Sequence, residues 1–122
     1  MLVASHLTGD FILQTDWQAA HKSGGLGRDP VSRRALVSHL TTYALAFVPA
    51  LVWIGSDQGT AAAVGIAALI VVPHLVQDDG RLLTFYVHRV KRSSVTAGDF
   101  IFVAVDQSFH VLALFGAALV AA

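Results

Sequence analysis

Long apolar runs alternate with short polar segments along the whole chain. Residues 35–54, 60–78 and 100–121 each form a run close to the roughly 20 residues that a helix needs to cross a bilayer. In lipid, every backbone N–H and C=O must be bonded within its own segment. Each of the three runs is therefore predicted to be a transmembrane helix.

The first apolar stretch, residues 1–18, is interrupted by polar side chains at His6, Asp10, Gln14 and Asp16. We expect a short fourth span that turns this polar stripe into the bundle. The alternative is an amphipathic helix that lies on the membrane surface.

Composition favours the membrane interpretation. Of the 122 residues, 55% are hydrophobic and 13% are charged, whereas soluble domains carry about 25% charged residues. So little charge disfavours an ordinary soluble enzyme and a nucleic-acid-binding domain. The absence of cysteine excludes disulfides, thiolate zinc sites and cysteine nucleophiles. The predicted fold class is all-α: one integral membrane domain over residues 1–122, folded as a four-helix bundle in the lipid bilayer.

The net charge of zero hides an uneven distribution. All eight basic residues lie within residues 22–34 and 81–92. Short loops rich in Lys and Arg stay cytoplasmic, so four spans would place both termini outside and both basic loops inside. Residues 81–92 mix basic and apolar side chains, which suits either an interfacial helix on an anionic leaflet or a plain loop.

Histidine and aspartate recur one helical turn apart inside the apolar segments. The pairs are His6/Asp10, His74/Asp78 and Asp106/His110, and His39 stands alone in the second span. Positions i and i+4 share a helix face. The order reverses in the last segment, which also runs in the opposite direction across the membrane from the first and third. All three pairs are therefore expected at one depth, in the cytoplasmic half.

Ionisable side chains inside a membrane are costly and usually functional. Imidazole nitrogens and carboxylate oxygens together suit zinc, with manganese or iron as alternatives. The predicted metal ligands are His6, Asp10, His39, His74, Asp78, Asp106 and His110. A divalent metal, zinc first, is the expected cofactor, and the alternative is a set of His–Asp hydrogen bonds that only hold helices together.

Other polar and small residues accompany these pairs. Gln14, Asp79 and Gln107 are expected to orient the ligands or to bind substrate, and the alternative for the two glutamines is a hydrogen bond between helices. Ala61 and Gly65 form a small-residue face that favours close packing, within the bundle or in a homodimer.

The opening segment, with the pattern H-x-x-x-D-F-x-x-Q from His6 to Gln14, resembles a bacterial and phage family of small integral membrane proteins catalogued as a domain of unknown function. A lone His on the second span, a His–Asp pair on the third and D-Q-x-x-H from Asp106 to His110 also match. The resemblance implies a multi-pass protein of the bacterial inner membrane. A looser similarity links the pattern to inner-membrane metal-dependent hydrolases.

Four functions remain open from the sequence. The first is a metal-dependent hydrolase acting on a lipid-like or isoprenoid substrate at the cytoplasmic leaflet, with Asp10 or Asp106 as the catalytic general base. The others are a divalent-metal transporter or sensor, a b-type haem protein, and a non-catalytic helper subunit of a membrane complex.

Overall fold

The computed structural model describes residues 1–122, and all its regular elements are helices. The helices are α1 (Leu2–Leu7), η1 (Thr8–Ile12), α2 (Asp16–His21), α3 (Pro30–Ala46), α4 (Val48–Gln58), α5 (Thr60–Asp78), α6 (Arg81–Phe85), η2 (Tyr86–Val90) and α7 (Phe100–Val120). The two η elements are π-helices. The all-α prediction is confirmed.

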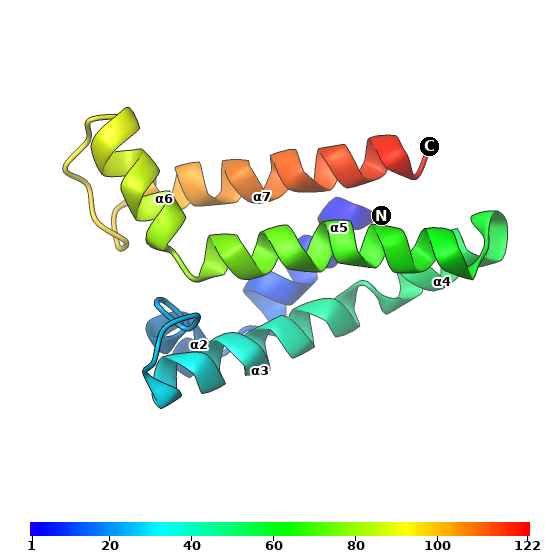
Figure 1. Cartoon of the computed structure of the whole chain (residues 1–122), viewed down its shortest axis with the longest axis horizontal. Coiled ribbons are helices and arrows are strands. Elements are labelled where there is room, and N and C mark those ends of the chain that lie inside the picture. Colours follow the sequence, from blue (N-terminus) through cyan, green and yellow to red (C-terminus); the bar gives the residue numbers. More distant parts are fainter.

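Helices α3–α4, α5 and α7 run side by side, and α1 lies against them (Figure 1). Both termini and the α4–α5 turn are found at one end of the bundle. The α2–α3 loop and α6 are found at the other end, which we call the loop end (Figure 1). The loop end therefore carries both basic stretches of the sequence.

Helices α5 and α7 are each long and apolar enough to cross a membrane. A third candidate span is the pair α3 and α4, which is bent by 51°. The bend falls at Phe47, two residues before Pro49, whose nitrogen has no hydrogen to donate. Large apolar side chains along these helices face outward, for example Val52, Phe115 and Leu119 at 65%, 60% and 64% exposure. Such an apolar outer surface is compatible with a protein that lies in a membrane.

The first segment differs from the single helix expected over residues 1–18. Helix η1 ends at Ile12, and a new helix starts after Thr15. The Thr15 hydroxyl accepts a hydrogen bond from the Gln18 backbone N–H, while the Thr15 N–H donates to the Gln18 side chain. This reciprocal capping box defines a helix start, so α2 is a separate helix that packs against α3.

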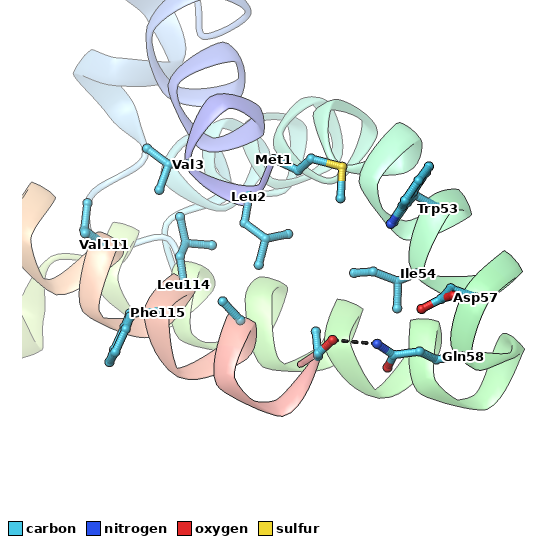
Figure 2. Close-up of a pocket in the computed structure, with 12 residues that line it drawn as sticks. Met1, Leu2, Val3, Trp53, Ile54, Asp57, Gln58, Val111, Leu114 and Phe115 are labelled. Carbon is cyan, nitrogen blue, oxygen red and sulfur yellow. Dashed lines mark hydrogen bonds between the residues drawn. The ribbon is translucent and has the colours of Figure 1, made fainter.

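A short first helix leaves the bundle open near the termini. A groove of about 480 Å³ lies between α1, α4 and α7, and its walls are mostly apolar (Figure 2). The face containing Ala61 and Gly65 is also exposed, and nothing lies within 4 Å of the position that a Gly65 Cβ would take. The small-residue face is therefore not packed within this chain, and the homodimer stays a prediction.

Helix α3 starts at the dipeptide Asp29-Pro30. The Asp29 carboxylate accepts a hydrogen bond of 2.8 Å from the Ser32 N–H, and Pro30 is the first residue of α3. Hydrogen bonding from Ser32 lowers the pKa of Asp29. Helix α3 consequently starts five residues earlier than the predicted run.

The interior has an apolar part and a polar part. The main apolar cluster contains Tyr43, Phe47, Ile54, Ile66, Ile70, Leu114 and Ala117. Its members from α4 and the first half of α5 lie toward the termini. The buried histidines and aspartates lie between this cluster and the loop end.

Candidate metal centre

Six ionisable side chains from four parts of the chain meet inside the bundle, and each is at most 6% exposed. They are His6 from α1, Asp10 from η1, His39 from α3, His74 and Asp78 from α5, and His110 from α7. We call these six residues the His/Asp centre. The structure thus brings together six of the seven side chains that the sequence analysis selected as metal ligands.

Asp78 is the residue around which the centre is organised. Its Oδ2 lies 2.9 Å from His39 Nε2 and 3.1 Å from His74 Nε2, and its Oδ1 lies 3.5 Å from His110 Nε2. His39 Nε2 and His74 Nε2 are themselves 3.1 Å apart. One carboxylate at the end of α5 therefore touches imidazoles from three helices.

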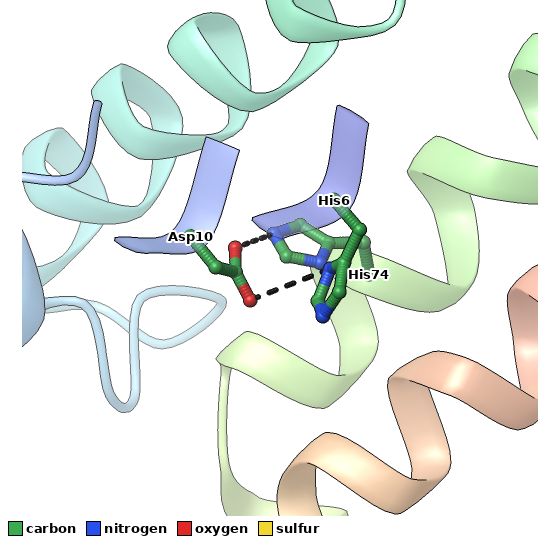
Figure 3. Close-up of side chains that lie close together, drawn as sticks. All are labelled: His6, Asp10 and His74. Atoms are coloured by element: carbon green, nitrogen blue, oxygen red, sulfur yellow. Dashed lines mark ion pairs between the residues drawn. The ribbon is translucent and has the colours of Figure 1, made fainter. Parts of the chain in front are cut away.

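Asp10 contacts two of the same imidazoles and that of His6. Its Oδ1 lies 3.3 Å from His39 Nε2 and 3.5 Å from His74 Nε2, and its Oδ2 lies 3.6 Å from His6 Nδ1. Figure 3 shows the Asp10 carboxylate facing both His6 and His74. Two overlapping groups are compact enough to hold a metal ion: His6–Asp10–His74 and His39–His74–Asp78.

The outer nitrogens of two imidazoles have partners of the kind seen for metal-binding histidines. His110 Nδ1 is 2.9 Å from the backbone oxygen of Asp106, and His6 Nε2 is 3.0 Å from Gln107 Oε1. Both oxygens are acceptors, so each of these ring nitrogens carries the proton. The opposite nitrogen of His110, Nε2, then directs its lone pair toward the Asp78 carboxylate at 3.5 Å. The opposite nitrogen of His6, Nδ1, accepts a hydrogen bond from the Tyr43 hydroxyl at 3.2 Å and lies 3.6 Å from Asp10 Oδ2.

The other two imidazoles are not fully satisfied by hydrogen bonds. His39 Nδ1 and His74 Nδ1 are buried without a hydrogen-bond partner. If both rings carry their protons on Nε2, two donors face each other at 3.1 Å. If either proton moves to Nδ1, it has no acceptor there. Hydrogen bonding alone therefore leaves this pair incompletely paired, which is unusual for buried polar groups.

Asp106 lies beside the His/Asp centre and outside both metal-sized groups. Its Oδ1 is 3.7 Å from His110 Nδ1, and its side chain is 24% exposed. Gln107 links the two regions, since its amide nitrogen donates to Asp106 Oδ2 at 3.3 Å. The structure therefore leaves Asp106, which the sequence predicts as a metal ligand, outside the His/Asp centre and next to His110.

Asp79, expected to orient the ligands or to bind substrate, lies outside the His/Asp centre. Its Oδ1 accepts a hydrogen bond of 2.8 Å from the Leu26 N–H, and its Oδ2 pairs with Arg81 at 2.9 Å. The Gly24 N–H also donates to its backbone oxygen at 2.8 Å. Asp79 thus fastens the α2–α3 loop to the loop end of α5, next to the His/Asp centre.

Two side chains that the sequence analysis does not predict at this site, Lys22 and Tyr43, contact residues of the His/Asp centre. Lys22 Nζ lies 2.9 Å from Asp78 Oδ2 and 2.6 Å from Gln14 Oε1. The Tyr43 ring stacks on His74 with centroids 3.4 Å apart, and its hydroxyl is 3.2 Å from His6 Nδ1. Tyr43 follows His39 by four residues, a spacing that signals a shared face. Nothing local to Lys22 predicts its position, which depends on how the loop folds back.

Comparisons with known proteins give one match. No curated protein and no solved structure matches the chain. The sequence model of one family, described as "Protein of unknown function (DUF3307)", matches residues 1–121. The chain therefore belongs to the DUF3307 family.

Proposed function

We propose that this chain is a multi-pass membrane protein that binds a divalent metal, zinc first, at the His/Asp centre. In this proposal α1–η1 inserts as a short fourth segment, both termini lie outside, and the loop end faces the cytoplasm. The two basic stretches at the loop end support this orientation.

The distances within the His/Asp centre carry the proposal. Two ligand atoms bound at about 2.0–2.1 Å to a tetrahedral zinc lie roughly 3.3 Å apart. Asp78 Oδ2 lies 2.9 Å from His39 Nε2 and 3.1 Å from His74 Nε2, and the two nitrogens are 3.1 Å apart. Asp10 Oδ1 lies 3.3 and 3.5 Å from the same two nitrogens and is available as a further ligand.

Charge balance points in the same direction. Asp10 and Asp78 are buried carboxylates, and Lys22 is the one Lys or Arg side chain that pairs with either of them. Burial of unbalanced charge is costly. A divalent cation in either metal-sized group would offset the carboxylates and accept histidine lone pairs.

We further propose that the bound metal supports hydrolysis of a lipid-like or isoprenoid substrate at the cytoplasmic leaflet. Such a metal lowers the pKa of bound water and supplies a nucleophile at neutral pH. Asp106 is the candidate general base, because it lies beside the centre without being a ligand. Water would add across the substrate's ester or phosphoester bond. One product keeps the hydroxyl, and the released alcohol takes the proton that Asp106 first accepts.

Two of the alternative functions are disfavoured by packing. An ion path through the membrane would have to cross the apolar cluster of Tyr43, Phe47 and neighbouring residues. A haem would need a planar gap between axial imidazoles, but His74 and His110 have ring centroids 4.8 Å apart, and Tyr43 stacks on His74. A helper subunit with purely structural His–Asp bonds leaves the His39 and His74 nitrogens unexplained.

Metal analysis of the full chain, purified in detergent, tests the proposal. We expect zinc, manganese or iron to co-purify, and we expect a chelator to lower the melting temperature and zinc to restore it. Stabilisation by a ligand that binds the folded state is the physical basis of this shift. Protein without metal, and with a melting temperature that neither treatment changes, would contradict the proposal.

Lys22→Gln is expected to tighten zinc binding by roughly tenfold. The Lys22 ammonium lies 2.9 Å from Asp78 Oδ2, so it competes with a cation for that carboxylate and repels it. Tenfold corresponds to about 1.4 kcal/mol, less than the ~4 kcal/mol Coulomb energy of unit charges at 4 Å and an effective dielectric constant of 20. Competition with a chromophoric chelator measures the affinity. Lys91→Gln, at an exposed position, is the control. Weaker zinc binding by Lys22→Gln than by the unsubstituted protein would show that Lys22 instead holds Asp78 in place.

A further inference from the structure

A cavity of about 240 Å³ opens beside the His/Asp centre, between α6–η2 and the adjoining parts of α5 and α7. Its inner wall is formed by Leu83, Tyr86 and Phe109, which are buried or half-buried. It is larger than the 150 Å³ apolar cavity that suffices for benzene in an engineered protein. We call it the α6 cavity.

The outer edge of the α6 cavity is apolar and open. Leu82, Phe85 and Val90 line it and are 60%, 57% and 59% exposed. Two exposed basic residues, Arg89 and Lys91, flank Val90 in the sequence. Apolar side chains next to basic ones match the boundary between acyl chains and anionic headgroups.

The inner end of the cavity is polar and adjoins the His/Asp centre. Asp106 and Gln77 are the two non-hydrophobic residues of the lining. Asp106 is within 3.7 Å of His110. Gln77 donates its amide hydrogen to the Phe109 backbone oxygen at 3.1 Å, but its Oε1 is buried with no hydrogen-bond partner. An unpaired buried acceptor costs free energy unless a ligand or water supplies a donor.

We propose that the α6 cavity binds the hydrocarbon chain of an amphiphilic substrate, with the reacting polar group at Gln77 and Asp106. The chain passes between Leu83 and Phe109 and leaves at the apolar edge. This inference rests on the proposed hydrolase, and it adds where the substrate binds and which side chains select it. Because the outer edge of the cavity is apolar and exposed, the ligand that fits it is a membrane lipid with an acyl or a prenyl chain.

Photolabelling of the full-length protein in vesicles tests the inference. The vesicles contain phosphatidylethanolamine and phosphatidylglycerol. One probe is a phosphatidylglycerol with a diazirine in one acyl chain, and the other is a diazirine-bearing prenyl phosphate. Mass spectrometry locates the adducts. Lipids that merely surround the protein reach exposed residues such as Leu112 and Phe115, whereas the buried Leu83 is reached by a chain inside the cavity.

We expect adducts at Leu83 with at least one probe, and the probe that labels Leu83 more efficiently identifies the chain type. Leu82→Trp narrows the outer edge and should lower this labelling at least fivefold. The matched control Leu112→Trp, at a residue that is 63% exposed on α7, should leave it unchanged. Labelling confined to outward-facing residues, or unaffected by Leu82→Trp, would overturn the inference.

The zinc content of the same samples separates this inference from the proposed function. Zinc-loaded protein without cavity labelling contradicts the inference and leaves the metal site standing. Cavity labelling in a protein that binds no metal supports a lipid site and contradicts the proposed hydrolase.

Discussion

Asp78→Asn is expected to weaken zinc binding by more than ~100-fold, the largest effect of any single substitution at the centre. The Asp78 carboxylate contacts His39, His74 and His110 at 2.9, 3.1 and 3.5 Å. Asparagine keeps the shape of the side chain but removes the negative charge and one lone-pair acceptor. Loss of an outer partner of a metal ligand already costs 10–100-fold in affinity, so loss of a ligand should cost more. Chelator competition on protein in detergent measures the change.

The same variant separates a metal site from a structural one. Asp57→Asn, at an exposed position at the termini end, controls for the general effect of losing a carboxylate. If the His–Asp contacts only hold helices together, Asp78→Asn should lower the melting temperature of chelator-treated protein and leave metal content unchanged. That pattern would support the helper-subunit interpretation over the metal centre.

Gly9→Ala is expected to destabilise the protein by about 1–3 kcal/mol, the usual cost of overpacking a filled interior. A Cβ on Gly9 would lie 2.7 Å from Tyr43 Cδ2 and 3.2 Å from Tyr43 Cα. The second contact is with backbone, so rotation of the ring alone does not relieve it. Because Tyr43 stacks on His74, its displacement should also weaken zinc binding. Thermal unfolding followed by circular dichroism, with zinc content on the same samples, measures both effects.

Gly65→Ala is the matched control for this substitution. Nothing lies within 4 Å of a Cβ at Gly65, which is an interior residue of α5. Alanine is favoured over glycine inside a helix by roughly 0.5–1 kcal/mol. The control should therefore keep or raise the melting temperature. Equal melting temperatures of Gly9→Ala and Gly65→Ala would show that the close contact between Gly9 and Tyr43 does not limit stability.

Local periodicity was enough to predict the third and fourth apolar helices and the residues that face the interior. The pairs His74/Asp78 and Asp106/His110 have the i, i+4 spacing of one helix face. Their reversed order places both pairs at one depth if α5 and α7 run in opposite directions, and the structure shows that they do (Figure 1). A sequence pattern can reveal a shared depth in this way because helix rise per residue is constant.

Other features depend on contacts that local patterns do not encode. The capping box at Thr15 divides the first segment, although its apolar and polar residues continue the helical pattern. Lys22 reaches Asp78 only because Asp79 fastens the α2–α3 loop to α5. The i, i+4 spacing predicts Asp106 as a metal ligand. In the structure its carboxylate is 3.7 Å from His110 Nδ1 and lies outside both groups of residues that could hold a metal ion.

The π-helix η1 makes the length of the first segment as important as its composition. The Leu13 N–H bonds to the Thr8 oxygen five residues back, so this turn holds one residue more than an α-turn. Loss of one residue after Asp10 would restore α-helical bonding in this turn and keep His6 and Asp10 four residues apart, whereas one extra residue between them would rotate His6 by about 100° relative to Asp10. His6 would then face away from Asp10. Over evolutionary time, the exposed Ile12 is free to vary in identity, whereas insertions between His6 and Asp10 should be selected against.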